Sequence, residues 1–265
     1  MPFYRPVRVL FGFAAALCLL GPAGLNAAPA RPNIVLIMAD DMGYSDIGCY
    51  GSEIETPALD RLAAGGVRMT QFYNTGRCCP TRASLLTGLH PHQTGLGHMT
   101  GTDRGTPAYQ GYLNRKCVTI AEVLKSAGYQ TFMSGKWHVG QNDSAWWPRQ
   151  RGFDRYYGIL AGAANYFRPS GQRGLTLDNE SVDPGDDYYM TDAFGDYATR
   201  FVDEAATKQA PFFLYLAFNA PHWPLHAPKE LVAKYRGKYR VGWDKLATER
   251  HARQVESGLI DPSWE

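Results

Sequence analysis

The sequence has no marked excess of charge of either sign, and this absence argues against two classes of partner. It contains 27 Lys and Arg residues and 25 Asp and Glu residues, which gives a formal net charge of +2. Binding to nucleic acid or to an anionic membrane surface draws on a marked basic surplus. We therefore expect no nucleic-acid partner. Small anionic substrates stay open, because a few local cations bind them without changing the total.

The sequence also has no apolar run that would cross a bilayer comfortably. The run from Val9 to Leu20 follows two arginines and precedes the small-residue stretch GPAGLNAAPA. This is the pattern of a signal peptide, which we assign to residues 1–30, with cleavage after Ala27 or Ala30. An uncleaved anchor is the alternative, but the run is short for that. The pattern predicts an exported protein, periplasmic or secreted, without a stable membrane anchor.

Cysteine is scarce, with five residues in the chain. Cys18 would leave with the signal peptide, and the four that remain are Cys49, Cys78, Cys79 and Cys117. In an oxidising compartment four cysteines form two disulfides in one of three connectivities. Composition alone therefore favours disulfide bonds as the role of the adjacent residues Cys78 and Cys79.

The chain contains no repeat or low-complexity tract. Segments with the apolar pattern of a buried strand alternate along it with segments that have the apolar pattern of a helix. Of its 265 residues 45% are hydrophobic and 20% charged, which suits a globular core. Buried strands are expected at residues 32–40, 66–74, 129–135 and 211–218. Helices are expected at residues 56–66 and 119–128, from Cys78 onward and from Thr191 onward. The alternation predicts an α/β fold with a mainly parallel sheet flanked by helices, while residues 140–187 are expected to form a long irregular loop region.

Polar residues follow the expected strands, at the edge of the sheet where ligands bind in open α/β folds. They are Asp40, Asp41, Cys78, Lys136, His138 and His222. Each has an ordinary explanation as a cap, a solvated side chain or a packed loop residue. Taken together they predict a pocket with a cation site and several positive groups, suited to an oxyanion ester. The three histidines His90, His92 and His98 match no zinc-binding spacing, and we expect them to be loop residues.

Four ordered segments carry a resemblance to a known family. CCPTRASLLTG (residues 78–88) fits the Cys-x-Pro-Ser/Thr-Arg pattern followed by Leu-Thr-Gly, and GYQTFMSGKWHVG (residues 128–140) is similar to a second signature ending in Gly-Lys-Trp-His. NIVLIMADDMGYSDIGCYG, beginning at Asn33, and NAPHWPLHAP (residues 219–228) resemble the family's first metal-binding and sulfate-binding segments. The chain thus resembles the type I, formylglycine-dependent sulfatases, which are arylsulfatase-like and share the alkaline phosphatase superfamily fold. The resemblance runs from about Pro32 to the last residue and predicts a catalytic domain over residues 31–265.

The resemblance implies a specific chemistry. Cys78 would be oxidised to formylglycine by a separate maturation enzyme, and the hydrated aldehyde would attack sulfur and later release sulfate. Asp40, Asp41 and residue 78 would ligate one divalent cation, with Ca²⁺ expected from their oxygen atoms. The catalytic residues implied are Cys78, Arg82, Lys136, His138 and His222, whereas Cys79 stands at a variable position and receives no catalytic role.

The sequence departs from the family pattern at one point. The family completes its metal site with an Asp-Asn pair that follows the segment containing His222, and a further lysine comes later. The only Asp-Asn pair here is Asp178-Asn179, which precedes that segment. We therefore expect the chain to be an N-terminal portion of a sulfatase, with Ca²⁺ bound weakly and activity low.

The sequence leaves three alternative functions open. The leading one is hydrolysis of an aryl sulfate or of a sulfated carbohydrate. A phosphonate monoester or phosphodiester hydrolase of the same superfamily is the second, because sulfate and phosphate esters share tetrahedral oxyanion geometry. A noncatalytic fragment with disulfide-bonded cysteines is the third.

Overall fold

The computed structural model describes residues 31–101 and 103–264, and residues Pro32–Glu265 cluster as one unit. The predicted signal peptide, residues 1–30, lies outside the described residues, so export and cleavage stay predictions. None of the helices in the described part of the chain combines the length and apolar character that a membrane crossing requires. The four described cysteines are all free thiols, so neither of the two disulfides considered from composition is formed.

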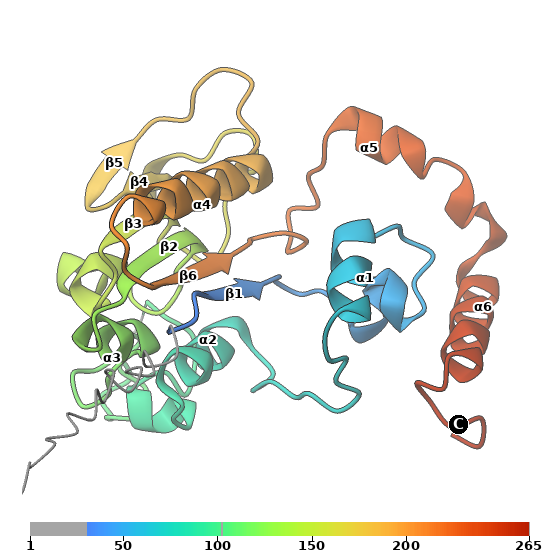
Figure 1. Cartoon of the computed structure of the whole chain (residues 1–265), viewed down its shortest axis with the longest axis horizontal. Helices are drawn as coiled ribbons and strands as arrows, with labels where there is room; N and C mark the ends of the chain where they lie inside the picture. Colours follow the sequence, from blue (N-terminus) through green and yellow to red (C-terminus); the bar gives the residue numbers. More distant parts are fainter. Residues whose placement is uncertain (1–30, 102, 265) are drawn as a thin grey trace, which may run out of the picture. The chain divides into compact units, whose positions relative to one another are not determined.

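One sheet organises the described residues (Figure 1). Its strands, in the spatial order β1-β6-β2-β3-β4-β5, are β1 (Ile34–Met38), β6 (Phe212–Ala217), β2 (Gln130–Lys136), β3 (Arg155–Ile159), β4 (Leu175–Leu177) and β5 (Glu180–Val182). The pairs β1–β6, β6–β2 and β2–β3 are parallel, while β3–β4 and β4–β5 are antiparallel. The predicted α/β fold with a mainly parallel sheet is confirmed.

Helices cover both faces of this sheet. The α-helices are α1 (Pro57–Ala64), α2 (Cys78–Thr87), α3 (Ile120–Ser126), α4 (Met190–Ala206), α5 (Lys229–Lys234) and α6 (Trp243–Glu256). Short 3-10 helices lie at Tyr44–Asp46, Gly48–Tyr50, Pro91–Thr94, Ser144–Trp146, Pro148–Arg151, Gly171–Arg173 and Lys238–Val241. The predicted start of α1 is confirmed, with Pro57 in its first turn. The predicted start of α3 is confirmed as well, since Thr119 and Glu122 form the expected capping box.

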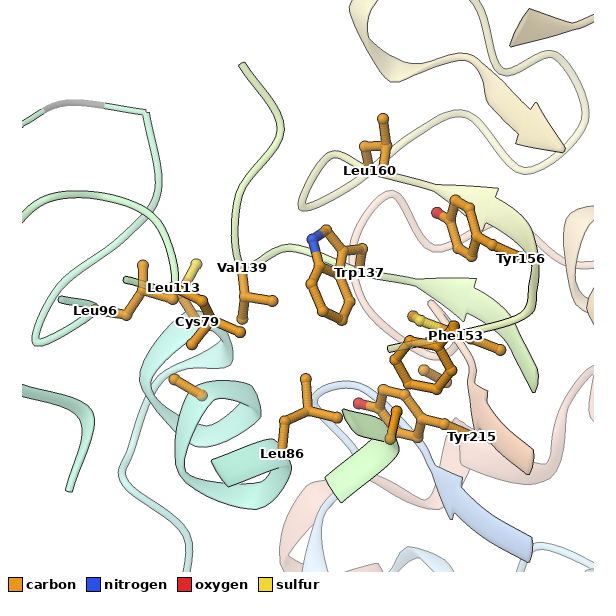
Figure 2. Close-up of a cluster of buried hydrophobic side chains, with 14 of the residues drawn as sticks. Cys79, Leu86, Leu96, Leu113, Trp137, Val139, Phe153, Tyr156, Leu160 and Tyr215 are labelled. Atoms are coloured by element: carbon orange, nitrogen blue, oxygen red, sulfur yellow. The ribbon is translucent and has the colours of Figure 1, made fainter. Parts of the chain in front are cut away.

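The alternation of side chains along β6 explains the two hydrophobic cores. Phe213 and Tyr215 face α2 and α3, in a cluster that also contains the fully buried Trp137 (Figure 2). Phe212 and Leu214 point to the other face and pack against α4. Successive residues of a strand point to opposite faces, so a strand apolar at every position is buried on both.

Three sequence-based expectations about strands are wrong. Residues 66–74 form no strand, and in the described residues no strand pairs with them, so Val67 and Phe72 are exposed. β1 is an edge strand rather than one buried on both faces, because Val35 and Ile37 are 50% and 49% exposed. Residues 140–187 are not a continuous loop, since they contribute β3, β4 and β5.

Candidate active site

The carboxyl ends of three adjacent parallel strands lie at one edge of the sheet. Met38 of β1 pairs with Ala217 of β6, and Gly135 of β2 pairs with the same Ala217. The three strands therefore end level with one another. The Asp40 amide donates to the Ala220 carbonyl at 3.0 Å, which joins the segments that follow β1 and β6. The parallel register thus places polar residues from distant parts of the sequence side by side, as predicted.

Two cations and one carboxylate form a buried ion cluster at this edge. Lys136 Nζ contacts Asp40 Oδ2, and Arg82 Nη2 lies 3.5 Å from Asp40 Oδ1, with all three residues buried. Arg82 also donates from Nη1 to the Lys136 carbonyl at 2.8 Å and to the Tyr215 hydroxyl at 3.2 Å. We call Asp40, Arg82 and Lys136 the ion cluster.

The ion cluster has one positive charge more than it has negative charge. Burial, with the nearby Arg82, lowers the pKa of Lys136, against the opposing effect of Asp40. Arg82 Nε is buried and has no hydrogen-bond partner among the described residues. An unused donor and an excess positive charge in a buried place favour an anion as ligand.

Cys78 is the first residue of α2, where the helix dipole favours a negative charge. A hydrogen bond with Cys79, together with His138 and Lys136, lowers the pKa of Cys78 to about 3 against the opposing effect of burial. The same hydrogen bond and burial raise the pKa of Cys79. Cys78 is half-buried, whereas Cys79 is fully buried in the core (Figure 2). Residue 78 is therefore a partly accessible, anion-stabilised position.

His138 lies beside Cys78 in a strained backbone conformation. Its φ is +53°, a region that residues with a side chain rarely adopt, and its side chain is buried. Burial and the charges of Lys136 and Arg82 lower the pKa of His138, while Cys78 opposes them. The imidazole is consequently neutral at neutral pH and able to accept a proton.

The His138 ring packs directly against Gly162, which has no side chain. This contact predicts the effect of adding one methyl group at residue 162. A Cβ at Gly162 would lie 2.2 Å from His138 Cε1, so Gly162→Ala is expected to displace the ring and destabilise the fold by about 1–3 kcal/mol. Urea denaturation measures the loss, and the NMR signals of His138 report its displacement. The control is Gly185→Ala, where a Cβ meets nothing within 4 Å. Equal stability of both variants, with an unmoved His138, would contradict the packing described.

His222 and Asp41 form a second, more exposed contact. His222 Nε2 lies 3.6 Å from Asp41 Oδ2, and the Asp41 side chain is 66% exposed. The loop that carries His222 is held by Tyr166, whose single hydroxyl hydrogen is shared between the carbonyl oxygens of Asn219 at 2.9 Å and His222 at 2.8 Å. Tyr166 is itself buried, so it packs in the interior and anchors this loop.

The described residues do not by themselves fit a calcium site. Both carboxylate oxygens of Asp40 face cations, and only Asp41 beside it offers a further exposed carboxylate. In the described part of the chain, the one group of three or more Asp, Glu, His or Cys side chains with metal-ligand spacing consists of Cys78, Cys79 and His138. Ca²⁺ takes six to eight oxygen ligands, so most of them would have to come from elsewhere. Asp178 does not supply one, since it pairs with Arg155 and Arg149.

The structure thus groups the predicted site residues in three sets. Asp40, Arg82 and Lys136 form the ion cluster, Cys78 and His138 lie together beside Cys79, and Asp41 contacts His222. Their catalytic and metal-binding roles stay predictions. His90 and His98 lie outside regular elements, whereas His92 lies in the 3-10 helix Pro91–Thr94 and so departs from the expected loop.

Two residues at the site carry no signal that sequence reasoning could have used. Tyr215 lies in a strand that is apolar throughout, yet its hydroxyl accepts a hydrogen bond from Arg82. Met99 follows a histidine-rich loop, yet its Sδ lies 3.8 Å from Cys78 Sγ. Both contacts join residues distant in the sequence, so only the folded chain reveals them.

Comparison with known proteins supports the interpretation of these motifs. The Sulfatase family model matches residues 32–259. The chain is 40% identical over 254 residues to an uncharacterized sulfatase of Schizosaccharomyces pombe, covering 89% of this chain and 46% of that protein. It is 38% identical over 258 residues to an arylsulfatase of Klebsiella aerogenes, covering 93% and 55%. The crystal structure of Ps i-CgsB in complex with k-i-k-neocarrahexaose superposes with a TM-score of 0.71 and 35% identity, covering 86% of this chain and 53% of that one.

The matched proteins are all sulfatases or similar to them in structure, and they also agree in how much of their length the chain covers. The chain spans about half the length of the relatives it matches. The family model, in turn, covers nearly all of the described residues and includes every residue of the site described above. The chain therefore belongs to the sulfatase family.

Proposed function

We propose that the protein hydrolyses sulfate esters, with an aryl sulfate or a sulfated carbohydrate as substrate. The observation that carries this proposal is the ion cluster, which holds excess positive charge and an unused Arg82 donor near the N-terminus of α2, where residue 78 lies. Among the relatives, one is named an arylsulfatase and another was solved in complex with k-i-k-neocarrahexaose. Both names favour the proposed substrate classes.

The reaction needs a nucleophile that can release sulfate again. Members of this family use formylglycine and a divalent metal, and a hydrated aldehyde at residue 78 supplies one hydroxyl for attack on sulfur and a second whose deprotonation ejects sulfate. We propose that a maturation enzyme forms this group from Cys78 and that the metal is Ca²⁺. Asp41 and residue 78 would face such an ion, Asp40 would have to exchange its contacts with Lys136 and Arg82 for it, and the remaining ligands would have to come from elsewhere.

The chain's own residues have distinct tasks in this proposal. Arg82 and Lys136 bind the anionic oxygens, because both carry N–H donors and are buried beside the nucleophile. His138 takes the proton in the release step, since its imidazole is neutral and lies next to residue 78. His222 donates a proton to the leaving alcohol from the exposed side, with Asp41 as its neighbour. Export, periplasmic or secreted, is part of the same proposal.

A comparison of matched substrates tests the proposed reaction. An aryl sulfate and the corresponding aryl phosphonate monoester are offered to protein made together with a maturation enzyme, and the released phenol is measured. We expect faster turnover of the sulfate ester, because the segments that contain Lys136, His138 and His222 are similar to those of sulfatases and the Sulfatase family model covers them. Both esters are monoanions, so net charge does not separate them. Faster phosphonate turnover would favour the second function considered above. Absence of any turnover, with the aldehyde present at residue 78, would identify a noncatalytic fragment.

A further inference from the structure

The unmodified Cys78 lies in a cluster of sulfur and nitrogen donors. Donor atoms of Cys78, Cys79 and His138 all lie within 4.8 Å of one another. A fourth atom, the thioether sulfur of Met99, lies 3.8 Å from Cys78 Sγ. We call these four residues the thiol cluster.

The donor types decide which metal ions the thiol cluster could hold. Thiolate and thioether sulfur atoms select soft ions such as Cu⁺, and thiolates with imidazole also bind Zn²⁺. Hard ions such as Ca²⁺ and Mg²⁺ prefer oxygen ligands, which this cluster does not offer. The distances are suitable, because sulfur ligands about 2.3 Å from a tetrahedral ion lie roughly 3.8 Å from one another.

We propose that, as long as residue 78 is a cysteine, the thiol cluster binds a thiophilic metal ion, either Cu⁺ or Zn²⁺. Cys79 gains a role in this way that the sulfatase reaction does not give it. Met99 distinguishes the two ions, since thioether sulfur is a ligand for Cu⁺ and a poor one for Zn²⁺.

The surroundings of the thiol cluster support a bound ion. Cys79 and His138 are buried, while Cys78 and Met99 are half-buried. An ion can therefore enter past Cys78 and Met99 and exchange its water ligands for the buried donors of Cys79 and His138. His138 Nδ1 is buried and has no hydrogen-bond partner among the described residues, so the ring has a nitrogen that no protein hydrogen bond occupies. Burial around a metal site excludes water and strengthens the bonds to the ion.

Metal binding would also affect maturation, and this consequence rests on the proposed function. A thiolate bound to a metal ion is withheld from the oxidation that forms the aldehyde. Protein made in excess Cu⁺ or Zn²⁺ is therefore expected to retain cysteine at residue 78, which the mass of the peptide containing residues 78–82 reports.

Equilibrium binding to the reduced chain, made without maturation enzyme, tests the proposal directly. Cu⁺ is delivered as a bicinchoninate complex and Zn²⁺ with a chromogenic chelator, and the release of each chelator is followed. One equivalent of ion is expected to bind. Cys78→Ser and Cys79→Ser should each weaken binding at least about tenfold, since even the outer partners of a metal site contribute that much. Met99→Leu should weaken Cu⁺ binding and leave Zn²⁺ binding unchanged.

Cys49→Ser is the matched control, because Cys49 is a half-buried free thiol that is not part of the thiol cluster. It should bind either ion as the unaltered chain does. Equal weakening by Cys49→Ser and Cys78→Ser, or equal affinity of the unaltered chain and the Cys78→Ser variant, would overturn the proposal. If Cys79→Ser does not fold, the ultraviolet thiolate-to-Cu⁺ absorption of the unaltered chain and its loss in Cys78→Ser decide. No sulfatase turnover enters this experiment, so its failure is distinct from failure of the proposed function.

Discussion

Replacing Asp40 by asparagine is expected to lower the free energy of unfolding by about 3–5 kcal/mol. The change removes the one carboxylate that the described residues place beside both Lys136 and Arg82, whose side chains are fully buried. Two buried cations then face each other without the carboxylate between them, and it no longer offsets their desolvation. Denaturation by urea at constant pH and ionic strength, monitored by far-UV circular dichroism, measures the loss.

The neighbouring carboxylate supplies the control. Asp41→Asn makes the same chemical change one residue away, but the Asp41 side chain is 66% exposed and, among the described residues, has only His222 as an ionic contact. Its effect on stability is expected to stay within about 0.5 kcal/mol, as for most surface substitutions. Similar small losses in both variants would mean that water reaches the ion cluster and that its charges are not buried in solution.

The strands that the sequence predicts correctly are those whose burial is visible locally. β6 is apolar at every position, and β2 follows a tight turn and runs into the Gly-Lys-Trp-His motif, ending at Lys136. Residues 66–74 begin with apolar and polar side chains in alternation, which is typical of a strand. They form no strand, because pairing requires a neighbour that the local pattern does not specify. β3, with the sequence RYYGI, was missed because its polar first residue and its glycine hide a five-residue strand in an irregular region.

The sequence predicts where the site lies, at one edge of the sheet, but it does not predict which site residues contact one another. Parallel strands that end level with one another bring Asp40 and Lys136 to one edge, and this follows from topology. The pairing of Asp40 with Lys136 and Arg82 does not follow, since sequence reasoning assigned that carboxylate to a cation. The positive φ of His138 and the proximity of Met99 to Cys78 likewise depend on how the loops after β2 and α2 fold back.

The largest effect on activity is expected from Cys78→Ser. A serine hydroxyl can attack sulfur once, breaking the bond to the alcohol, which leaves with a proton. The resulting serine sulfate ester has no second hydroxyl on the same carbon, so it lacks the route by which a hydrated aldehyde ejects sulfate. Turnover should fall by about 10³-fold or more, and the intact mass should rise by one sulfuryl group after incubation with an aryl sulfate.

Two further variants separate this chemistry from damage to the fold. Cys78→Ala removes the nucleophile altogether, so it should neither turn over substrate nor gain mass, whereas Cys49→Ser should keep the activity of the unaltered protein. Cys78 is half-buried at the first turn of α2, so serine and alanine are both accommodated there without a large cavity. Retained multiple turnover in Cys78→Ser would show that residue 78 is not the nucleophile, and the anion-binding ion cluster would then have to serve a different attacking group. Accumulation of the ester without turnover would instead tie the release of sulfate to the second hydroxyl of the aldehyde hydrate, with His138 placed to take its proton.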